Sequence, residues 1–400
     1  MAHSLPQKFQ AAGVTCGVKA SGKPDLALFV SEVPAAMAGV FTTNRVVGAP
    51  VIVDRKRVPA ERGRAVVINS GNANACTGET GLQNAERMTA NVAEAIGCSA
   101  EEVLVCSTGI IGVQLPMDVI SSGIPQAAAA LSDSDDAFAA AARAMMTTDT
   151  FSKQAEQELV IDDRTLKVSG AAKGAAMIAP NMATMLCVLM TDAPLDADQC
   201  DRILRQAVDR TFNCISVDGH ESTSDTVLLL ANGAAGGVRL TEDQLQQFQG
   251  VVDDICRKLA TDIIRDAEGA EHFVTVDVAG FETREQAARI AKAICESALV
   301  KTAITGNDPN WGRITSAAGY AGVDFDVQFL TLSINETEVF RAGTPVEFDE
   351  ATLSEEMQSN RDVHLKLNLS DGPASGTESV RFWTSDLTQE YVRLNSEYTT

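Results

Sequence analysis

A run of six apolar residues, Met185–Met190, follows a loop of small residues and constrains the fold more than any other feature of the chain. The loop, Gly174–Ala183, is rich in alanine, and its Pro180–Asn181 pair predicts a tight turn. A short apolar run bounded by turn residues is typical of a buried strand. Thr184 is therefore predicted where an irregular loop enters a buried strand, a position that can hold its hydroxyl rigidly.

A threonine in such a position can attack its own chain. Its hydroxyl would attack the carbonyl of Ala183 in an N-to-O acyl shift, and water would then hydrolyse the ester. The new amino terminus would carry an α-amine with an ordinary pKa of about 7.7–8.0, so that one residue supplies both nucleophile and base. This chemistry needs no histidine. The pattern alone favours a threonine that merely begins a core strand, because such threonines are common. The four histidines, none of them in a triad-like motif, are His3, His220, His272 and His364.

The rest of the chain alternates between strand and helix patterns, which predicts an α/β (α+β) protein with mixed sheets, a compact catalytic region and a smaller C-terminal domain. Helix 81–97 is expected to end at Gly97, and helix 197–210 to begin at the N-cap Asp196. A polar loop at 216–237 leads into a strand. Strands are predicted at 26–31, 51–54, 65–69, 104–109, 323–334, 338–348 and 363–370, a β-hairpin at 158–169, and further helices at 134–146, 242–266 and 283–299.

Composition excludes several classes of function. The formal net charge of −22 argues against nucleic acid as a partner, and it means that an acidic substrate would need a local positive group. The nine cysteines are scattered, odd in number and without a C-x-x-C pair, which argues against a disulfide framework or a zinc site. No apolar stretch reaches the roughly 20 residues of a membrane helix, and the N-terminus lacks an apolar signal core. We expect a cytoplasmic protein without a metal or cofactor.

Seven motifs along the chain resemble those of a known protein family. In chain order they are GNANACTG (71–78), CSTGIIG (106–112), MTTDTF (146–151), KGAAMIAPNMATML (173–186), VDGHESTSDTVLLLANG (217–233), AEGA (267–270) and DPNWGRI (308–314). The series resembles the ornithine acetyltransferase family of arginine biosynthesis across nearly the whole chain. The resemblance implies the architecture that this family shares with self-processing aminopeptidases. It also implies cleavage between Ala183 and Thr184 into fragments 1–183 and 184–400, usually assembled as a heterotetramer.

The resemblance further assigns roles to individual residues. It implies that Thr184 is the nucleophile and that Thr108 and Gly109 form the oxyanion hole. Without the resemblance, the pattern at each position has an ordinary explanation. Thr108 and Gly109 would form a small-residue turn, and Thr147 would lie at a polar helix end. Lys173 and Glu268 would be surface residues, and the C-terminal residues would belong to a frayed chain end. The substrate-binding residues that it implies are Thr147, Lys173, Thr184, Glu268, Asn395 and Thr400.

The implied reaction is a ping-pong transfer in which Thr184 takes the acetyl group from N²-acetyl-L-ornithine and passes it to L-glutamate. Some family members also accept acetyl-CoA, and the sequence leaves open whether this chain does. Two alternatives remain at this point. One is a self-processing aminopeptidase or amidase of similar architecture. The other is an uncleaved amino-acid-binding or scaffold protein.

The chain departs from the family pattern in two places. Ala176 stands where the family usually has glycine, and its methyl group restricts positive φ angles. Glu271-His272 follow the AEGA motif where Thr-Lys is more usual, which makes this edge of the expected site more acidic. By default, Asp218, Thr223 and Asp225 in the polar loop are given a structural role.

Overall fold

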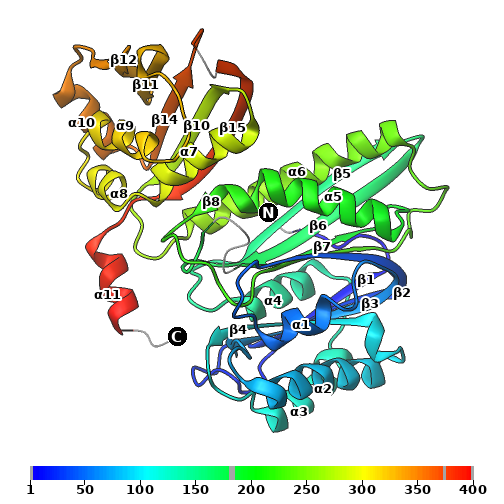
Figure 1. Ribbon diagram of the computed structural model, residues 1–400. Coiled ribbons are helices and arrows are strands. Elements are labelled where there is room, and N and C mark those ends of the chain that lie inside the picture. Colours follow the sequence, from blue (N-terminus) through cyan, green and yellow to red (C-terminus); the bar gives the residue numbers. More distant parts are fainter. Residues whose placement is uncertain (1–2, 180–184, 373–374, 398–400) are drawn as a thin grey trace.

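The computed structural model describes residues 3–179, 185–372 and 375–397, which fold into two mixed β-sheets with helices packed against them (Figure 1). The helices are α1 Ala49–Asp54, α2 Gly78–Ile96, α3 Met117–Ala129, α4 Asp135–Met145, α5 Ala197–Arg210, α6 Glu242–Arg265, α7 Arg284–Glu296, α8 Ala298–Thr305, α9 Trp311–Gly319, α10 Glu350–Ser359 and α11 Gln389–Glu397. The strands are β1 Phe9–Val14, β2 Leu26–Phe41, β3 Ala60–Asn72, β4 Val103–Ile110, β5 Lys153–Ile161, β6 Arg164–Lys173, β7 Leu186–Thr191, β8 Ile215–Ser216, β9 Thr226–Ala231, β10 Phe273–Phe281, β11 Leu330–Ile334, β12 Thr337–Arg341, β13 Thr344–Pro345, β14 Asp362–Leu369 and β15 Ser375–Ser385.

The larger sheet has eight strands in the order β4-β3-β2-β9-β7-β6-β5, with β1 paired to β2. Helices α5 and α6 pack against this sheet, as does α4. Strand β7 lies inside the sheet, antiparallel to β6 and parallel to β9, and all of its residues are buried. Burial on both faces explains why this strand is uniformly apolar instead of alternating. The predicted buried strand is confirmed.

Strands from the two sides of residue 184 interleave in this sheet. Strand β9 lies between β2 and β7, and β7 lies between β9 and β6. Strands β2 and β6 precede residue 184 in the chain, whereas β7 and β9 follow it. The pairing of β6 with β7 and of β9 with β2 therefore joins the two parts of the chain by backbone hydrogen bonds.

The smaller sheet has seven strands in the order β13-β12-β11-β14-β10-β15-β8, with α7 and α9 packed against it. It forms the separate upper lobe in Figure 1, and α11 leaves this lobe towards the larger one. The two residues of β8 pair with β15, so the segment that follows α5 joins the smaller sheet. The expected smaller C-terminal α/β domain is confirmed.

Four of the sequence predictions were wrong. The strand predicted at 323–334 covers only β11, because residues 327–329 form a 3-10 turn, and the strand predicted at 338–348 is the hairpin of β12 and β13. Residues 51–54 are helical, because Gly48 and Pro50 start helix α1 ahead of the β-branched Val51-Ile52-Val53 that pointed to a strand. The single helix predicted at 283–299 is instead α7 followed by α8, because Ser297 leaves the helical conformation and caps α8 through the amide of Val300.

Other local predictions are confirmed. The hairpin turns at Asp162 and Asp163, both at positive φ, as a two-residue hairpin requires. Gly97 is left-handed at the end of α2, and Asp196 caps α5. None of the described helices is both long and apolar enough to cross a bilayer. All nine cysteines lie in the described ranges and are free thiols.

Candidate active site

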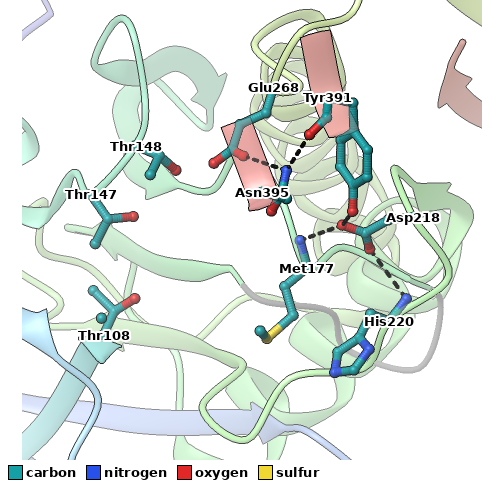
Figure 2. A pocket seen from close by; sticks show the side chains of 11 residues that line it. Thr108, Thr147, Thr148, Met177, Asp218, His220, Glu268, Tyr391 and Asn395 are labelled. Atoms are coloured by element: carbon teal, nitrogen blue, oxygen red, sulfur yellow. Dashed lines mark hydrogen bonds between the residues drawn. The ribbon is translucent and has the colours of Figure 1, made fainter. Parts of the chain in front are cut away.

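A cavity of about 300 Å³ gathers five of the residues to which the resemblance gave roles, although they lie far apart in the sequence. Three of its threonines lie on one side, and the C-terminal helix lies on the other (Figure 2). Ala183, Thr184 and Thr400 lie outside the described residues. The lining residues are Thr108, Gly109, Thr147, Thr148, Ala176, Met177, Asp218, His220, Glu268, Tyr391 and Asn395.

The end of strand β4 supplies Thr108 and Gly109. The pairing of β3 with β4 slips in register opposite Asn72, which marks a bulge at this point. Gly109 has φ +134°, and a Cβ atom on it would lie 2.3 Å from the backbone carbon of Gly71. Both the backbone angle and the close approach therefore require glycine here. The bulge places a bare backbone segment at the cavity wall.

Lys173 lies behind this wall instead of lining it. Its side chain is buried, and its ammonium group donates a hydrogen bond of 3.2 Å to the hydroxyl oxygen of Thr108. Because an ammonium can only donate, the Thr108 oxygen accepts this bond and keeps its own hydrogen for another partner. Burial lowers the pKa of Lys173, although the nearby carboxylate of Asp149 acts in the opposite direction. The structure thus links two residues that the sequence treated separately.

A buried ion-pair network lies next to these residues. The ammonium of Lys153 lies 2.7 Å from Asp149 and 2.6 Å from Asp266, and all three side chains are at most 2% exposed. Burial alone would raise the pKa of Asp149, but the charges of Lys173 and Lys153 outweigh that effect and hold it at about 2. Buried charges with this many partners fix the segments that carry them.

The network positions two segments of the cavity wall. Asp149 accepts hydrogen bonds from the amides of Thr147, at 2.9 Å, and Gly174, at 2.7 Å. Asp266, directly after α6, accepts from the amide and the hydroxyl of Thr150. The sequence analysis gave these carboxylates and Lys153 no role, because Asp266 lies more than 100 positions from its partners and only the fold brings them together.

Lys19 is a further residue that the motifs did not indicate. Its ammonium donates 2.7 Å hydrogen bonds to the carbonyls of Pro24 and Met146, and Met146 directly precedes Thr147. Burial lowers its pKa to about 8. The side chain also packs against Gly71, whose backbone adjoins Gly109. Lys19 therefore supports both parts of the threonine-bearing wall from outside the cavity.

The opposite wall is formed by α11 and the segment that follows α6. Asn395 donates a 3.0 Å hydrogen bond to the carboxylate of Glu268, and the hydroxyl of Tyr391 donates one of 3.0 Å to Asp218 (Figure 2). Thr388, just before the helix, donates to the carbonyl of Gly269. No residue of α11 from 389 to 397 is fully buried. The helix therefore closes the cavity through these side-chain hydrogen bonds and through the partly buried ring of Tyr391, which packs against the core.

Both departures from the motif pattern are accommodated. Ala176 does not have a positive φ; in this loop Gly174 and Met177 do. His272 does not line the cavity, and its buried ring is bonded to Asp386 at 2.9 Å and to the carbonyl of Met357 at 3.2 Å. The other histidine–aspartate pair, His364 with Asp277, lies in the smaller sheet. Neither of these histidines lines the cavity.

Comparison with known proteins identifies the family. The ArgJ family model matches residues 10–400. The chain belongs to the ArgJ family. The arginine biosynthesis bifunctional protein ArgJ of Rhodopirellula baltica is 47% identical over 401 residues, covering 100% of this chain and 97% of the relative. The protein of the same name from Symbiobacterium thermophilum is 46% identical, covering 99% and 98%.

The chain is also similar in sequence to a protein of known structure. The ornithine acetyltransferase of Mycobacterium tuberculosis, determined in complex with ornithine, is 41% identical and matches 45% of this chain and 95% of its own, with a TM-score of 0.41. The family resemblance drawn from the seven motifs is confirmed by the ArgJ match, which reaches from residue 10 to the end of the chain.

Proposed function

We propose that this ArgJ-family protein transfers the acetyl group of N²-acetyl-L-ornithine to L-glutamate, with Thr184 as the nucleophile after cleavage between Ala183 and Thr184. Family membership supports this, as do relatives at 46–47% identity that are named arginine biosynthesis bifunctional proteins. The expected fragments are 1–183 and 184–400. A heterotetramer, a cytoplasmic location and acetyl-CoA as a second acetyl donor belong to the same proposal.

One observation carries the chemistry: the hydrogen bond from Lys173 to the oxygen of Thr108. An acetyl transfer passes through a tetrahedral oxyanion, which needs donors fixed in advance. The free hydroxyl hydrogen of Thr108 is one such donor, and the amide of Gly109 at the β4 bulge is the other. Lys173 orients the first and adds positive charge behind it.

The steps follow from these groups. In self-cleavage the Thr184 oxygen attacks the carbonyl carbon of Ala183, the peptide nitrogen leaves as an amine, and water hydrolyses the resulting ester to free the carboxylate of Ala183. In catalysis the same oxygen attacks the acetyl carbonyl of acetylornithine, and ornithine leaves with a proton from the Thr184 ammonium. The glutamate amine then attacks the acetyl ester, returns a proton to Thr184 and departs as N-acetylglutamate.

The charges around the cavity suit an amino acid. Glu268, held by Asn395, offers a carboxylate to a substrate ammonium group, and Lys173 adds positive charge behind Thr108 on the opposite wall. The hydroxyl of Thr147 lies on the opposite side of the cavity. We assign these groups to substrate binding, together with Thr400, which lies outside the described residues.

Intact mass of the purified chain is the first test. The wild type should give two fragments that meet at 183/184, whereas Thr184→Ala should give one uncut species without transfer activity. A wild-type chain that stays whole and still transfers acetyl groups would sink this mechanism. Product release that does not depend on glutamate would instead select the aminopeptidase or amidase alternative. Assays with acetyl-CoA and with acetylornithine as sole donor decide between one donor and two.

A further inference from the structure

The polar loop between β8 and β9 holds an aspartate near each end, and each accepts hydrogen bonds from the backbone of a segment that flanks residues 180–184 in the chain. Asp218 lies at its start and Asp225 at its end, directly before β9. The two contact different segments of chain: Asp218 the residues that lead towards position 180, and Asp225 the residue that follows position 184. The reaction as described above uses neither carboxylate.

Asp218 binds the segment before the cleavage position. One carboxylate oxygen accepts from the amide of Met177 at 2.7 Å, and the other from the amide of Ile178 at 2.9 Å. The carbonyl of Ile178 in turn accepts from the amide of Val217 at 2.7 Å. Asp218 also accepts from the amide of His220. With the bond from Tyr391, its two oxygens receive four hydrogen bonds.

The backbone at Met177 adopts a conformation that needs such support. Its φ of +57° lies in the left-handed region, which costs a side chain with a Cβ atom roughly 1 kcal/mol or more. Residues in this region persist when their surroundings determine them, and they cluster at functional sites. The carboxylate of Asp218 accepts hydrogen bonds from two successive amides and so stabilises this backbone conformation.

Asp225 binds the segment after the cleavage position. Its side chain is fully buried and accepts from the amide of Met185 at 3.1 Å, while the amide of Thr226 donates to the Met185 carbonyl at 3.1 Å. Both polar groups of the Met185 backbone are therefore fixed, one by Asp225 at the end of the loop and the other by the first residue of β9. The carbonyl of Asp225 accepts from Thr42, which connects the loop to the end of β2.

We propose that Asp218 and Asp225 form a clamp that positions the chain on either side of the Ala183–Thr184 peptide for self-cleavage. The inference rests on the proposed function. Each is a positioning residue, since it acts through the backbone of residues 177, 178 and 185. An acyl shift needs the attacking oxygen and the carbonyl in near-attack geometry, and a displacement of about 1 Å can cost 100-fold in rate. Because both aspartates belong to one loop, they hold the segments before and after the cleavage position in a fixed arrangement relative to each other.

The test follows the rate at which the freshly synthesised full-length chain is cut, measured by intact mass. Asp218→Asn keeps the shape but sets an NH₂ group against backbone donors, and Asp225→Ala removes the acceptor for Met185. Each is expected to slow cleavage at least about tenfold. Asp192→Asn is the matched control, because Asp192 is buried at the other end of β7 and also accepts two backbone amides, those of Lys167 and Gln7.

Thermal midpoints separate positioning from folding. Each clamp variant is compared with uncut Thr184→Ala, and one that does not fold is replaced by the glutamate variant, which keeps the charge but shifts the oxygens. A folded clamp variant that is cut at the wild-type rate overturns the clamp, as does a control that slows equally. If the wild type itself stays whole, the proposed function fails instead, so the two failures are distinguishable.

Discussion

The two walls of the cavity are built in opposite ways. The wall with Thr108, Gly109 and Thr147 is backed by buried lysines and carboxylates, and its glycine tolerates no added atom. The wall with Tyr391 and Asn395 is a short helix that has no fully buried residue and is held by side-chain hydrogen bonds. A transition state needs donors that do not move, whereas substrates must enter and leave. We infer that the first wall supports the chemistry and that the second wall controls the entry and exit of substrates.

Removing the central charge of the rigid wall should have the largest effect. Lys153→Met leaves Asp149 and Asp266 buried without their shared partner, which should cost about 3–5 kcal/mol in the free energy of unfolding. Thermal or denaturant unfolding measures this. Lys366→Met, which breaks the more exposed pair with Glu336, serves as control and should hardly move the midpoint. Equal midpoints for the two variants would refute the rigid-wall description.

Adding one methyl group to this wall tests its chemistry. Gly109→Ala should lower kcat about 100-fold with a smaller change in KM. The added carbon would clash with the backbone of Gly71, so the Gly109 amide, which we propose as an oxyanion donor, would have to move. Steady-state kinetics on the cut enzyme measures both constants. Gly112→Ala is matched to it: its φ is also positive, but no atom lies within 4 Å of the added carbon. A comparable fall in kcat for Gly112→Ala would assign the effect to backbone strain alone.

Removing the helical wall should produce the reverse pattern. A chain that ends at Thr388 lacks α11 and with it the bonds from Tyr391 and Asn395. We expect KM to rise about tenfold or more, which corresponds to about 1.4 kcal/mol of lost binding. The thermal midpoint should change little, because the helix has no fully buried residue. A truncated chain with unchanged KM would show that the helix plays no part in binding.

The smallest expected effect concerns the base of that helix, where His272 pairs with Asp386. The hydrogen bond to Asp386 raises the pKa of His272, so the folded state holds this proton more tightly than the unfolded state does. The stabilisation is therefore complete below the ordinary pKa of about 6.5 and is lost as pH rises through the higher folded pKa. Thermal midpoints of wild type and His272→Gln should differ most between about pH 5 and 6.5 and should converge above. A difference that grows with pH would contradict the assignment.

The sequence predicted some features of the molecule better than others. The apolar run at β7 and the caps of α2 and α5 depend on neighbouring residues, so local patterns were sufficient for them. Residues 51–54 failed because a glycine and a proline outside that window decided the local structure. The resemblance gave roles to five residues that line one cavity, but it gave none to Lys153, Asp266 or Lys19. Those positions depend on contacts between distant segments, which no local pattern encodes.

The interleaving of strands in the larger sheet has a consequence for the order in which folding and cleavage can occur. If the chain is cut after position 183, β7 and β9 still lie between β6 and β2, with hydrogen-bonded neighbours on both sides. The two products could separate only if the backbone hydrogen bonds between β9 and β2 and between β7 and β6 were broken. Each would be left with open strand edges, which are prone to aggregate. If the proposed cleavage takes place, the chain must therefore fold as one continuous polypeptide before it is cut.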